Sequence, residues 1–212
     1  MKNIIGLALL ICGVINIGFA QKDKQALEVL DNLSQKYKKM NGFNASFEYI
    51  LDNQDEDLNE ALSGTILVKG KKYKLDMGSQ IIYNDNQSVW TYIPDAEEVN
   101  VSEYDPEDQQ ISLSNIFEIY KSGFKYLING DVSTDTDVAV DLVPEDVSTT
   151  YFKIRMTINK ASNELKSFRL FEKSGNRYLY KVVKFEELKS VSDREFRFDE
   201  KAFPSVEVID FR

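Results

Sequence analysis

The sequence predicts a mainly β protein with a few helices, built on one large, curved antiparallel sheet. Apolar residues alternate with polar ones in about a dozen short runs, separated mostly by tight turns that leave no room for crossover helices. Aromatic residues make up 12% of the chain, and they favour strands and large apolar surfaces. An antiparallel sheet of this size tends to curl as its twist accumulates, so we expect one face to be concave.

One amphipathic helix is expected at residues 25–40, ahead of the first strand. Its apolar residues recur at three- and four-residue steps from Ala26 to Met40, while charged residues occupy the other positions. Gly42 follows directly, at a place where helices are often capped.

The period of the apolar residues changes to two at Phe43, which indicates strands from there on. An acidic connection is expected at 52–60, and Asn-Asp-Asn at 84–86 is typical of a hairpin turn. The expected strands are residues 43–51, 62–68, 73–77, 81–83, 88–93, 97–101, 124–128, 138–143, 151–158, 165–172, 177–187 and 206–211.

A second, short helix is expected in the middle of the chain. Ser112 or Ser114 could cap it, its apolar residues fall within 116–120, and Gly123 would end it. Together with the helix at 25–40, it could cover the concave face of the sheet. A covered, curved sheet is a container.

The first 20 residues have the pattern of a secretory signal peptide. Lys2 precedes an apolar run at 4–19, and Gly18 and Ala20 place small residues where a signal peptidase cleaves, after Ala20. Lipidation at Cys12 is the less favoured interpretation, because the apolar run continues beyond it. Residues 21–212 would then form a single domain without cysteine.

Composition excludes several classes of function. The formal net charge of −9 should repel nucleic acid, which we do not expect as a partner. The chain has no histidine and no cysteine after position 12, so Ser-His and Cys-His nucleophiles and the usual zinc ligands are missing. Phosphate-binding glycine motifs are also missing. We therefore expect neither a catalytic site nor a cofactor or metal.

Three motifs resemble the LolA-type periplasmic lipoprotein carriers. The chain has GTILVK at 64–69 and NDNQSVWTYIP at 84–94, which are similar to the family's G-x-[LI]-x-V-K strand and D-G-x-x-[LV]-W-x-Y-x-P hairpin. The expected helix followed by FNASF at 43–47 is similar to the family's helix followed by an F-x-A-x-F strand. The likeness continues through residues 151–185 and so covers most of the chain after the signal peptide.

The resemblance implies an unclosed β-barrel with helices as a lid over a hydrophobic cavity. Its cargo would be the acyl chains of lipoproteins, received in the periplasm from an ABC-type transporter of the inner membrane and passed to an acceptor in the outer membrane. We expect the carrier to be a monomer.

Two positions depart from the family pattern. Lys69 is followed by Gly70, where family members have an arginine and a proline, and lysine lacks the planar fork of the arginine that holds the lid. Asn86 replaces the glycine of the D-G turn.

The predicted cavity lining combines apolar residues of the strands and of the middle helix. Trp90 and Tyr92 share a face because they are two residues apart, although this does not tell which face is concave. The lining residues predicted on the strands are Phe47, Tyr49, Ile66, Val68, Leu75, Trp90, Tyr92 and Val99, and those predicted on the lid are Ile116, Phe117 and Tyr120. The alternative for each residue is an ordinary closed core.

Two other functions fit the same pattern. One is a binding module on this fold that senses lipid or lipoprotein. The other is a hydrolase that uses two carboxylates from separate strands, which would turn over glycans. Carboxylates cluster at 55–57 and at Asp135 and Asp137, but neither group has the spacing of a calcium loop.

Overall fold

The computed structural model describes residues 23–53, 55–105, 111 and 113–212. In this part of the chain a 15-residue helix, α1 (Lys24–Lys38), precedes a single sheet of twelve strands. The predicted signal peptide, residues 1–20, lies outside the described residues. The strands are β1 (Phe43–Asn53), β2 (Leu58–Lys69), β3 (Lys72–Asp76), β4 (Ile81–Asn84), β5 (Ser88–Ile93), β6 (Glu98–Glu103), β7 (Phe124–Ile128), β8 (Asp137–Pro144), β9 (Tyr151–Asn159), β10 (Leu165–Glu172), β11 (Arg177–Glu187) and β12 (Glu207–Asp210).

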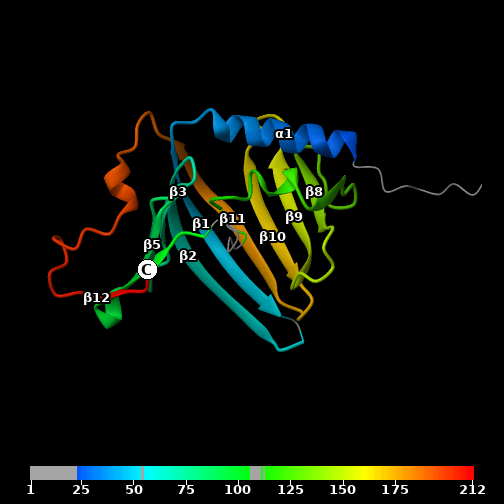
Figure 1. Ribbon diagram of the computed structural model, residues 1–212. Coiled ribbons are helices and arrows are strands. Elements are labelled where there is room, and N and C mark those ends of the chain that lie inside the picture. Colours follow the sequence, from blue (N-terminus) through cyan, green and yellow to red (C-terminus); the bar gives the residue numbers. More distant parts are fainter. Residues whose placement is uncertain (1–22, 54, 106–110, 112) are drawn as a thin grey trace, which may run out of the picture.

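The sheet is curved and does not close into a barrel. Its strand order is β12-β6-β5-β4-β3-β2-β1-β11-β10-β9-β8-β7, and neighbouring strands are antiparallel except for β12 and β6. The two edge strands, β12 and β7, lie at opposite ends of this order. Figure 1 shows the sheet bending beneath α1, which lies across one end of the strands. The predicted mainly β fold with an unclosed antiparallel sheet is confirmed.

Helix α1 begins at a side-chain cap that also fixes it to the sheet. One carboxylate oxygen of Asp23 accepts hydrogen bonds from the backbone N–H groups of Gln25 and Ala26, at 2.8 and 3.3 Å. The other oxygen accepts from the N–H of Ile128 in β7, at 3.1 Å, and this bond lowers the pKa of Asp23 below its ordinary value.

Among the helices in the described part of the chain, none has both the length and the apolar character of a membrane span.

The predicted second helix is shorter than expected. Residues 113–118 form turns, and only the 3₁₀ helix η2 (Ile119–Lys121) follows before Gly123, which has a φ of +76°. We call residues 113–121 the turn segment; Ser112 lies outside the described residues. The segment buries Leu113, Ile116, Phe117 and Tyr120 almost completely. These four residues keep the three- and four-residue spacing that predicted the helix, but only residues 119–121 are helical.

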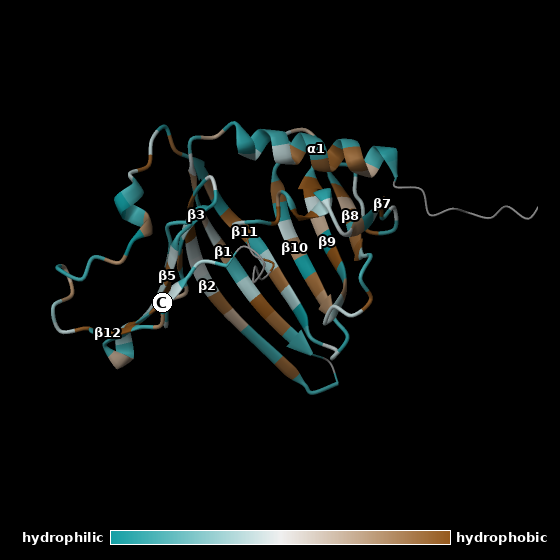
Figure 2. Ribbon diagram, viewed as in Figure 1, coloured by the Kyte–Doolittle hydropathy of each residue, from teal (hydrophilic) through white to brown (hydrophobic). Residues whose placement is uncertain are grey.

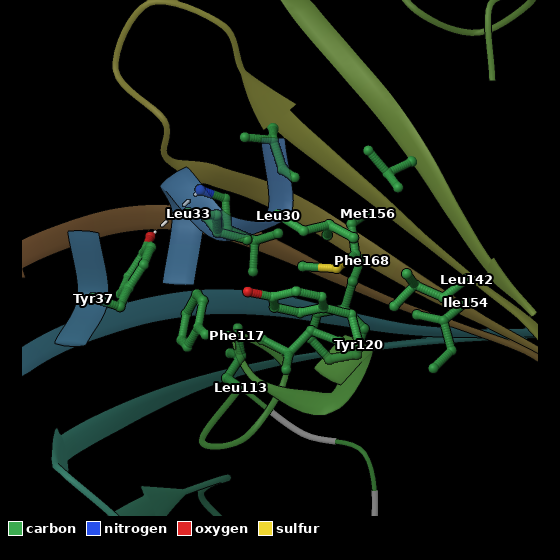
Figure 3. Close-up of a cluster of buried hydrophobic side chains, with 14 of the residues drawn as sticks. Leu30, Leu33, Tyr37, Leu113, Phe117, Tyr120, Leu142, Ile154, Met156 and Phe168 are labelled. Atoms are coloured by element: carbon green, nitrogen blue, oxygen red, sulfur yellow. Dashed lines mark hydrogen bonds between the residues drawn. The ribbon is translucent and has the colours of Figure 1, made fainter. Parts of the chain in front are cut away.

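One end of the concave face is filled by the protein's own side chains. Figure 3 shows α1 and the turn segment inserting apolar residues toward β8–β10. Tyr37 of α1 stacks on Phe117 with the ring centroids 3.7 Å apart. The fully buried residues of this core include Leu30, Leu33, Ile154, Met156 and Phe168. In this half of the molecule the interior is a closed core. Figure 2 shows that hydrophobic stretches of α1 lie over β9 and β10.

A second apolar cluster lies on the outer face of the sheet. Tyr83, Tyr92 and Val99, from β4, β5 and β6, pack against Phe198, and Trp90 lies beside them. Phe198 belongs to the segment after β11, which contains the 3₁₀ helix η3 (Asp193–Phe196), passes around this face and ends in β12 (Figure 1). We call residues 189–212 the C-terminal segment.

An ion pair attaches the C-terminal segment to the turn between β4 and β5. Arg197 donates a hydrogen bond of 2.7 Å to Asp85, whose side chain is 4% exposed. Asp85 also accepts from the backbone N–H groups of Gln87 and Ser88, both at 2.9 Å. Burial by itself would raise the pKa of Asp85, but these hydrogen bonds together lower it below its ordinary value.

We expect Asp85→Asn to destabilise the protein at neutral pH and to flatten its acid unfolding profile. The pKa of Asp85 is lower in the folded state, so its contribution is complete above the unfolded-state value of about 3.9 and is lost as the pH falls through the folded-state pKa. A loss of about 1 kcal/mol corresponds to a Tm lowered by about 2–4 °C in a protein of this size. Differential scanning calorimetry from pH 7 to pH 3 measures both effects. An equal loss at every pH would contradict this role of the Asp85 charge.

Candidate functional site

The other half of the concave face is hollow. A cavity of about 910 Å³ lies on the inner face of β1–β6, next to the turn segment. Apolar side chains from five strands form much of its lining, including Phe47, Ile66, Leu75, Ile82 and Val89. The cavity reaches solvent, because exposed residues also line it: Leu62, Lys71, Ser79, Glu103 and Glu118.

Strand pairing explains why the lining is continuous. Ile66 of β2 lies opposite Leu75 of β3, and Leu75 lies opposite Ile82 of β4. Residues directly opposite each other on antiparallel strands point to the same face. Three neighbouring strands therefore place one apolar residue each in a row across the floor of the cavity.

An aromatic wall separates the cavity from the filled core. Tyr180 of β11 stacks on Phe168 at 4.5 Å and contacts Tyr49 edge-on at 4.9 Å. Burial raises the pKa of Tyr180 above its ordinary value, so its hydroxyl stays neutral. Phe47 lies next to Tyr180, 6.0 Å between centroids, and is 1% exposed. Both Phe47 and Tyr180 line the cavity on one side, and Phe168 lies in the core on the other.

Gly64 makes room for the Phe47 ring. A Cβ atom at position 64 would lie 2.6 Å from Cζ of Phe47, 2.9 Å from Sδ of Met77 and 2.9 Å from the backbone oxygen of Asp76. The ring of Phe47 therefore packs against the backbone of β2 at the glycine of the GTILVK motif. Its absence of a side chain helps to set the depth of the cavity floor.

The structure divides the sequence-predicted lining residues among three places. Four of them line the cavity, Phe47, Tyr49, Ile66 and Leu75, and the buried Phe47 and Ile66 also belong to the core cluster. Four lie in the filled core: Val68, Ile116, Phe117 and Tyr120. The remaining three belong to the outer cluster: Trp90, Tyr92 and Val99.

The outer position of the hairpin aromatics follows from strand parity. Trp90 and Tyr92 do share a face, but it is the neighbours Val89 and Thr91 that line the cavity. Trp90 lies opposite Tyr83 on one side and Val101 on the other, and all three face outward. The outward orientation of Trp90 and Tyr92 can be recognised only from how β5 pairs with β4 and β6. Alternation within a single strand does not tell which of its two faces is concave. Sequence reasoning also missed several lining residues: Tyr73, Met77, Ile82, Val89, Ile111, Leu113, Ile119 and Tyr180.

Lys69, the last residue of the GTILVK motif, binds the C-terminal segment. Its Nζ donates to the backbone oxygen of Val191 at 2.9 Å and to Asp193 at 2.7 Å, and Lys72 reaches the same carboxylate at 3.0 Å. Hydrogen bonds from these two lysines lower the pKa of Asp193 to about 2. This pair of lysines therefore holds the C-terminal segment against the end of β2 and the start of β3.

The turn segment and α1 are joined by a different contact. The hydroxyl of Tyr120 donates a hydrogen bond of 2.6 Å to Asp31 of α1, and Lys38 of α1 pairs with Glu118 at 2.9 Å. Burial and the hydrogen bond to Asp31 raise the pKa of Tyr120 above its ordinary value, so the hydroxyl remains a donor at any physiological pH. Helix α1 is in turn tied to the sheet by Lys36, which pairs with Glu164 at 2.9 Å.

We expect Tyr120→Phe to loosen the turn segment without unfolding the sheet. The variant keeps the buried ring and removes the hydroxyl with its hydrogen bonds to Asp31 and Ser34 of α1, of which the charge-assisted one to Asp31 contributes about 1.5–3 kcal/mol. Hydrogen exchange of the amides in 113–121 should become faster, with little change in β9 and β10. Tyr151→Phe is the matched control, since its hydroxyl has no hydrogen-bond partner among the described residues. Unchanged exchange in Tyr120→Phe would show that this hydrogen bond does not hold the segment.

Comparisons with known proteins agree with this architecture. The family model for the outer membrane lipoprotein carrier protein LolA matches residues 38–199. An uncharacterized conserved protein from Thermus thermophilus has the same fold, with a TM-score of 0.58 and 14% identity over 88% of this chain and 99% of its own. Structures with lower scores include a LolA superfamily protein from Nitrosomonas europaea, with a TM-score of 0.46 and 13% identity over 82% of this chain and 98% of its own. No curated protein matches the sequence.

The matched residues run from the end of α1, through the strands that form the cavity, to the part of the C-terminal segment that contacts the outer face. The family comprises binding and carrier proteins. Because this match spans well over half of the chain, the protein belongs to the LolA family of outer membrane lipoprotein carrier proteins.

Proposed function

We propose that this protein is a periplasmic carrier that holds the acyl chains of lipoproteins in its cavity and moves them from the inner to the outer membrane. The observation that supports this most is the apolar, solvent-reaching cavity of about 910 Å³ beside a filled core. Pockets that enclose small ligands have volumes of roughly 300–1,000 Å³. The cavity is therefore of a size to enclose apolar groups.

The chemistry of the lining suits an acyl chain. Each methylene removed from water contributes about 0.8 kcal/mol, so several acyl chains together would keep a free lipoprotein bound to its membrane. A carrier must offer comparable apolar surface and yet release the chains to the next acceptor. Aromatic rings and the flexible thioether of Met77 make contacts without fixed direction. Such contacts can hold a chain without fixing its position.

The remaining parts of the proposal concern location and partners. Cleavage after Ala20 would release the protein into the periplasm as a monomer. An ABC-type transporter of the inner membrane would load it, and an outer-membrane acceptor would unload it. Neither step needs a catalytic group or a cofactor, because no bond is made or broken.

Native mass spectrometry of the protein isolated from its own cell envelope tests this function. We expect a population carrying acylated peptide or lipoprotein, and expect the purified protein to take up a synthetic N-acylated peptide but not the same peptide without its acyl group. Uptake of free phospholipid alone, with no acylated peptide from the envelope, would favour a lipid-sensing role. A mass of the bare protein in both settings would refute acyl binding altogether.

A further inference from the structure

The outer face of β9–β11 carries a cluster of cations around two phenylalanine rings. Register places Lys153 of β9 opposite Phe171 of β10, and Phe171 opposite Arg177 of β11. In the neighbouring row, Arg155 of β9 lies opposite Arg169 of β10. We call this set the basic patch, and its residues are Phe152, Lys153, Arg155, Arg169, Phe171 and Arg177. It stands out in a chain whose formal net charge is −9.

Three cations of the basic patch, those of Lys153, Arg155 and Arg177, lie against the phenylalanine rings. Nζ of Lys153 is 4.2 Å from the centroid of Phe171, and the guanidinium of Arg177 is 5.3 Å from Phe171 and 5.5 Å from Phe152. Arg177 also donates to two backbone oxygens, those of Glu172 and Asn176, at 2.9 and 2.8 Å. These contacts hold the charged groups in place before any ligand arrives.

The positive charge of the patch is only partly neutralised by the protein itself. Arg155 makes two hydrogen bonds to Asp141, of 2.6 and 2.8 Å. Burial alone would raise the pKa of Asp141, but hydrogen bonds from Arg155 and Asn129 lower it, so this carboxylate is ionised. Asp52 of β1, opposite Arg177, lies at the border of the patch.

Arg169 has no such partner among the described residues. It lies opposite Arg155 on the neighbouring strand, and Arg155 already engages both oxygens of Asp141, so that carboxylate is not available to Arg169. An external anion at this point would neutralise the charge of Arg169. Arg169 and its surroundings therefore favour a negatively charged ligand over an empty surface.

We propose that the basic patch docks an acidic segment of a partner protein, with carboxylates at Arg169 and Lys153 and apolar side chains against Phe152 and the exposed Val143 of β8. The planar guanidinium of Arg169 suits the two-pronged geometry of a carboxylate, and Lys153 supplies an ammonium group that is held against Phe171. A peptide contacts the patch alone, whereas a flat anionic membrane would also come close to the acidic remainder of this chain, whose net charge is −9; a peptide is therefore favoured over a lipid surface. This docking face is on the opposite side of the sheet from the cavity and is independent of what the cavity holds.

The probe is a fluorescein-labelled peptide of alternating glutamate and leucine, titrated with the protein at low ionic strength. We expect saturable binding that weakens with added salt, because a Debye length of about 10 Å at 0.1 M screens exposed charges. The double variant Lys153→Gln/Arg169→Gln should bind at least tenfold more weakly. The control Lys184→Gln/Lys201→Gln removes the same charge from exposed positions outside the patch and should bind like the unchanged protein. Equal Tm values confirm that both variants are folded.

Several outcomes would overturn the docking proposal. Equal weakening in both double variants would show a general charge effect, and absence of binding would show no site. Patch-dependent binding to phosphatidylglycerol vesicles in place of the peptide would identify a lipid surface. Concentration-dependent dimers that Lys153→Gln/Arg169→Gln abolishes would identify a second copy of this chain as the ligand.

Discussion

Replacing Leu75 with tryptophan should weaken binding of an N-acylated peptide about tenfold or more. Leu75 lies in the middle of the apolar row on the cavity floor, between Ile66 and Ile82. The larger indole would occupy space that an acyl chain needs. Excluding even two methylenes from the cavity removes about 1.6 kcal/mol at 0.8 kcal/mol each, which is more than a factor of ten in Kd. Titration calorimetry with the acylated peptide measures the effect.

The matched control for this prediction is Val183→Trp. Val183 is on β11, is 60% exposed and does not line the cavity, so an added indole there leaves the cavity unchanged. Its affinity for the acylated peptide should equal that of the unchanged protein. Equal affinities of Leu75→Trp and Val183→Trp would mean that the acyl chain binds elsewhere.

Adding a single methyl group at Gly64 should destabilise the protein by about 1–3 kcal/mol. The new Cβ would lie 2.6 Å from the ring of Phe47 and 2.9 Å from the backbone oxygen of Asp76. The oxygen belongs to a paired strand and the ring is fully buried, so neither can move freely. Overpacking of this kind costs about 1–3 kcal/mol. Urea unfolding of Gly64→Ala, followed by tyrosine and tryptophan fluorescence, gives the change in the free energy of unfolding.

Two further variants separate this clash from a general effect of alanine. Gly130→Ala should be nearly neutral, because a Cβ there meets no atom within 4 Å and its φ is not in the left-handed range. Phe47→Leu shortens the side chain that Gly64→Ala would strike. The loss from Gly64→Ala should therefore be smaller in the Phe47→Leu background. A similar loss at Gly64 and Gly130, or strict additivity of Gly64→Ala with Phe47→Leu, would exclude the clash.

Much of the fold could be predicted from local pattern, because each strand carries its own alternation. The main differences arose where pairing or packing between distant segments overrides that pattern. Residues 58–60 were predicted to belong to an acidic connection, but β2 begins at Leu58 because it pairs along the full length of β1. The middle helix was predicted from its apolar spacing. The turn segment instead places its apolar residues between α1 and the sheet.

The cavity was harder to predict than the fold. Alternation identifies the two faces of each strand but cannot tell which face is concave, and this misplaced Trp90 on the inner side. The decisive information is the C-terminal segment, whose Phe198 and Phe203 cover Tyr92 on the outside. The division of the concave face into a filled half and a hollow half likewise depends on where α1 lies. That position results from contacts between residues more than a hundred positions apart, such as Lys36 with Glu164.

Photo-crosslinking with a peptide whose acyl chain carries a diazirine tests most directly whether the cavity holds the acyl group. The account predicts that, after irradiation and mass mapping, the chain is attached to residues of the cavity floor and wall such as Phe47, Tyr49 and Leu75. Crosslinks confined to Trp90 and Tyr92 on the outer face, or none above the level of a free diazirine, would contradict it.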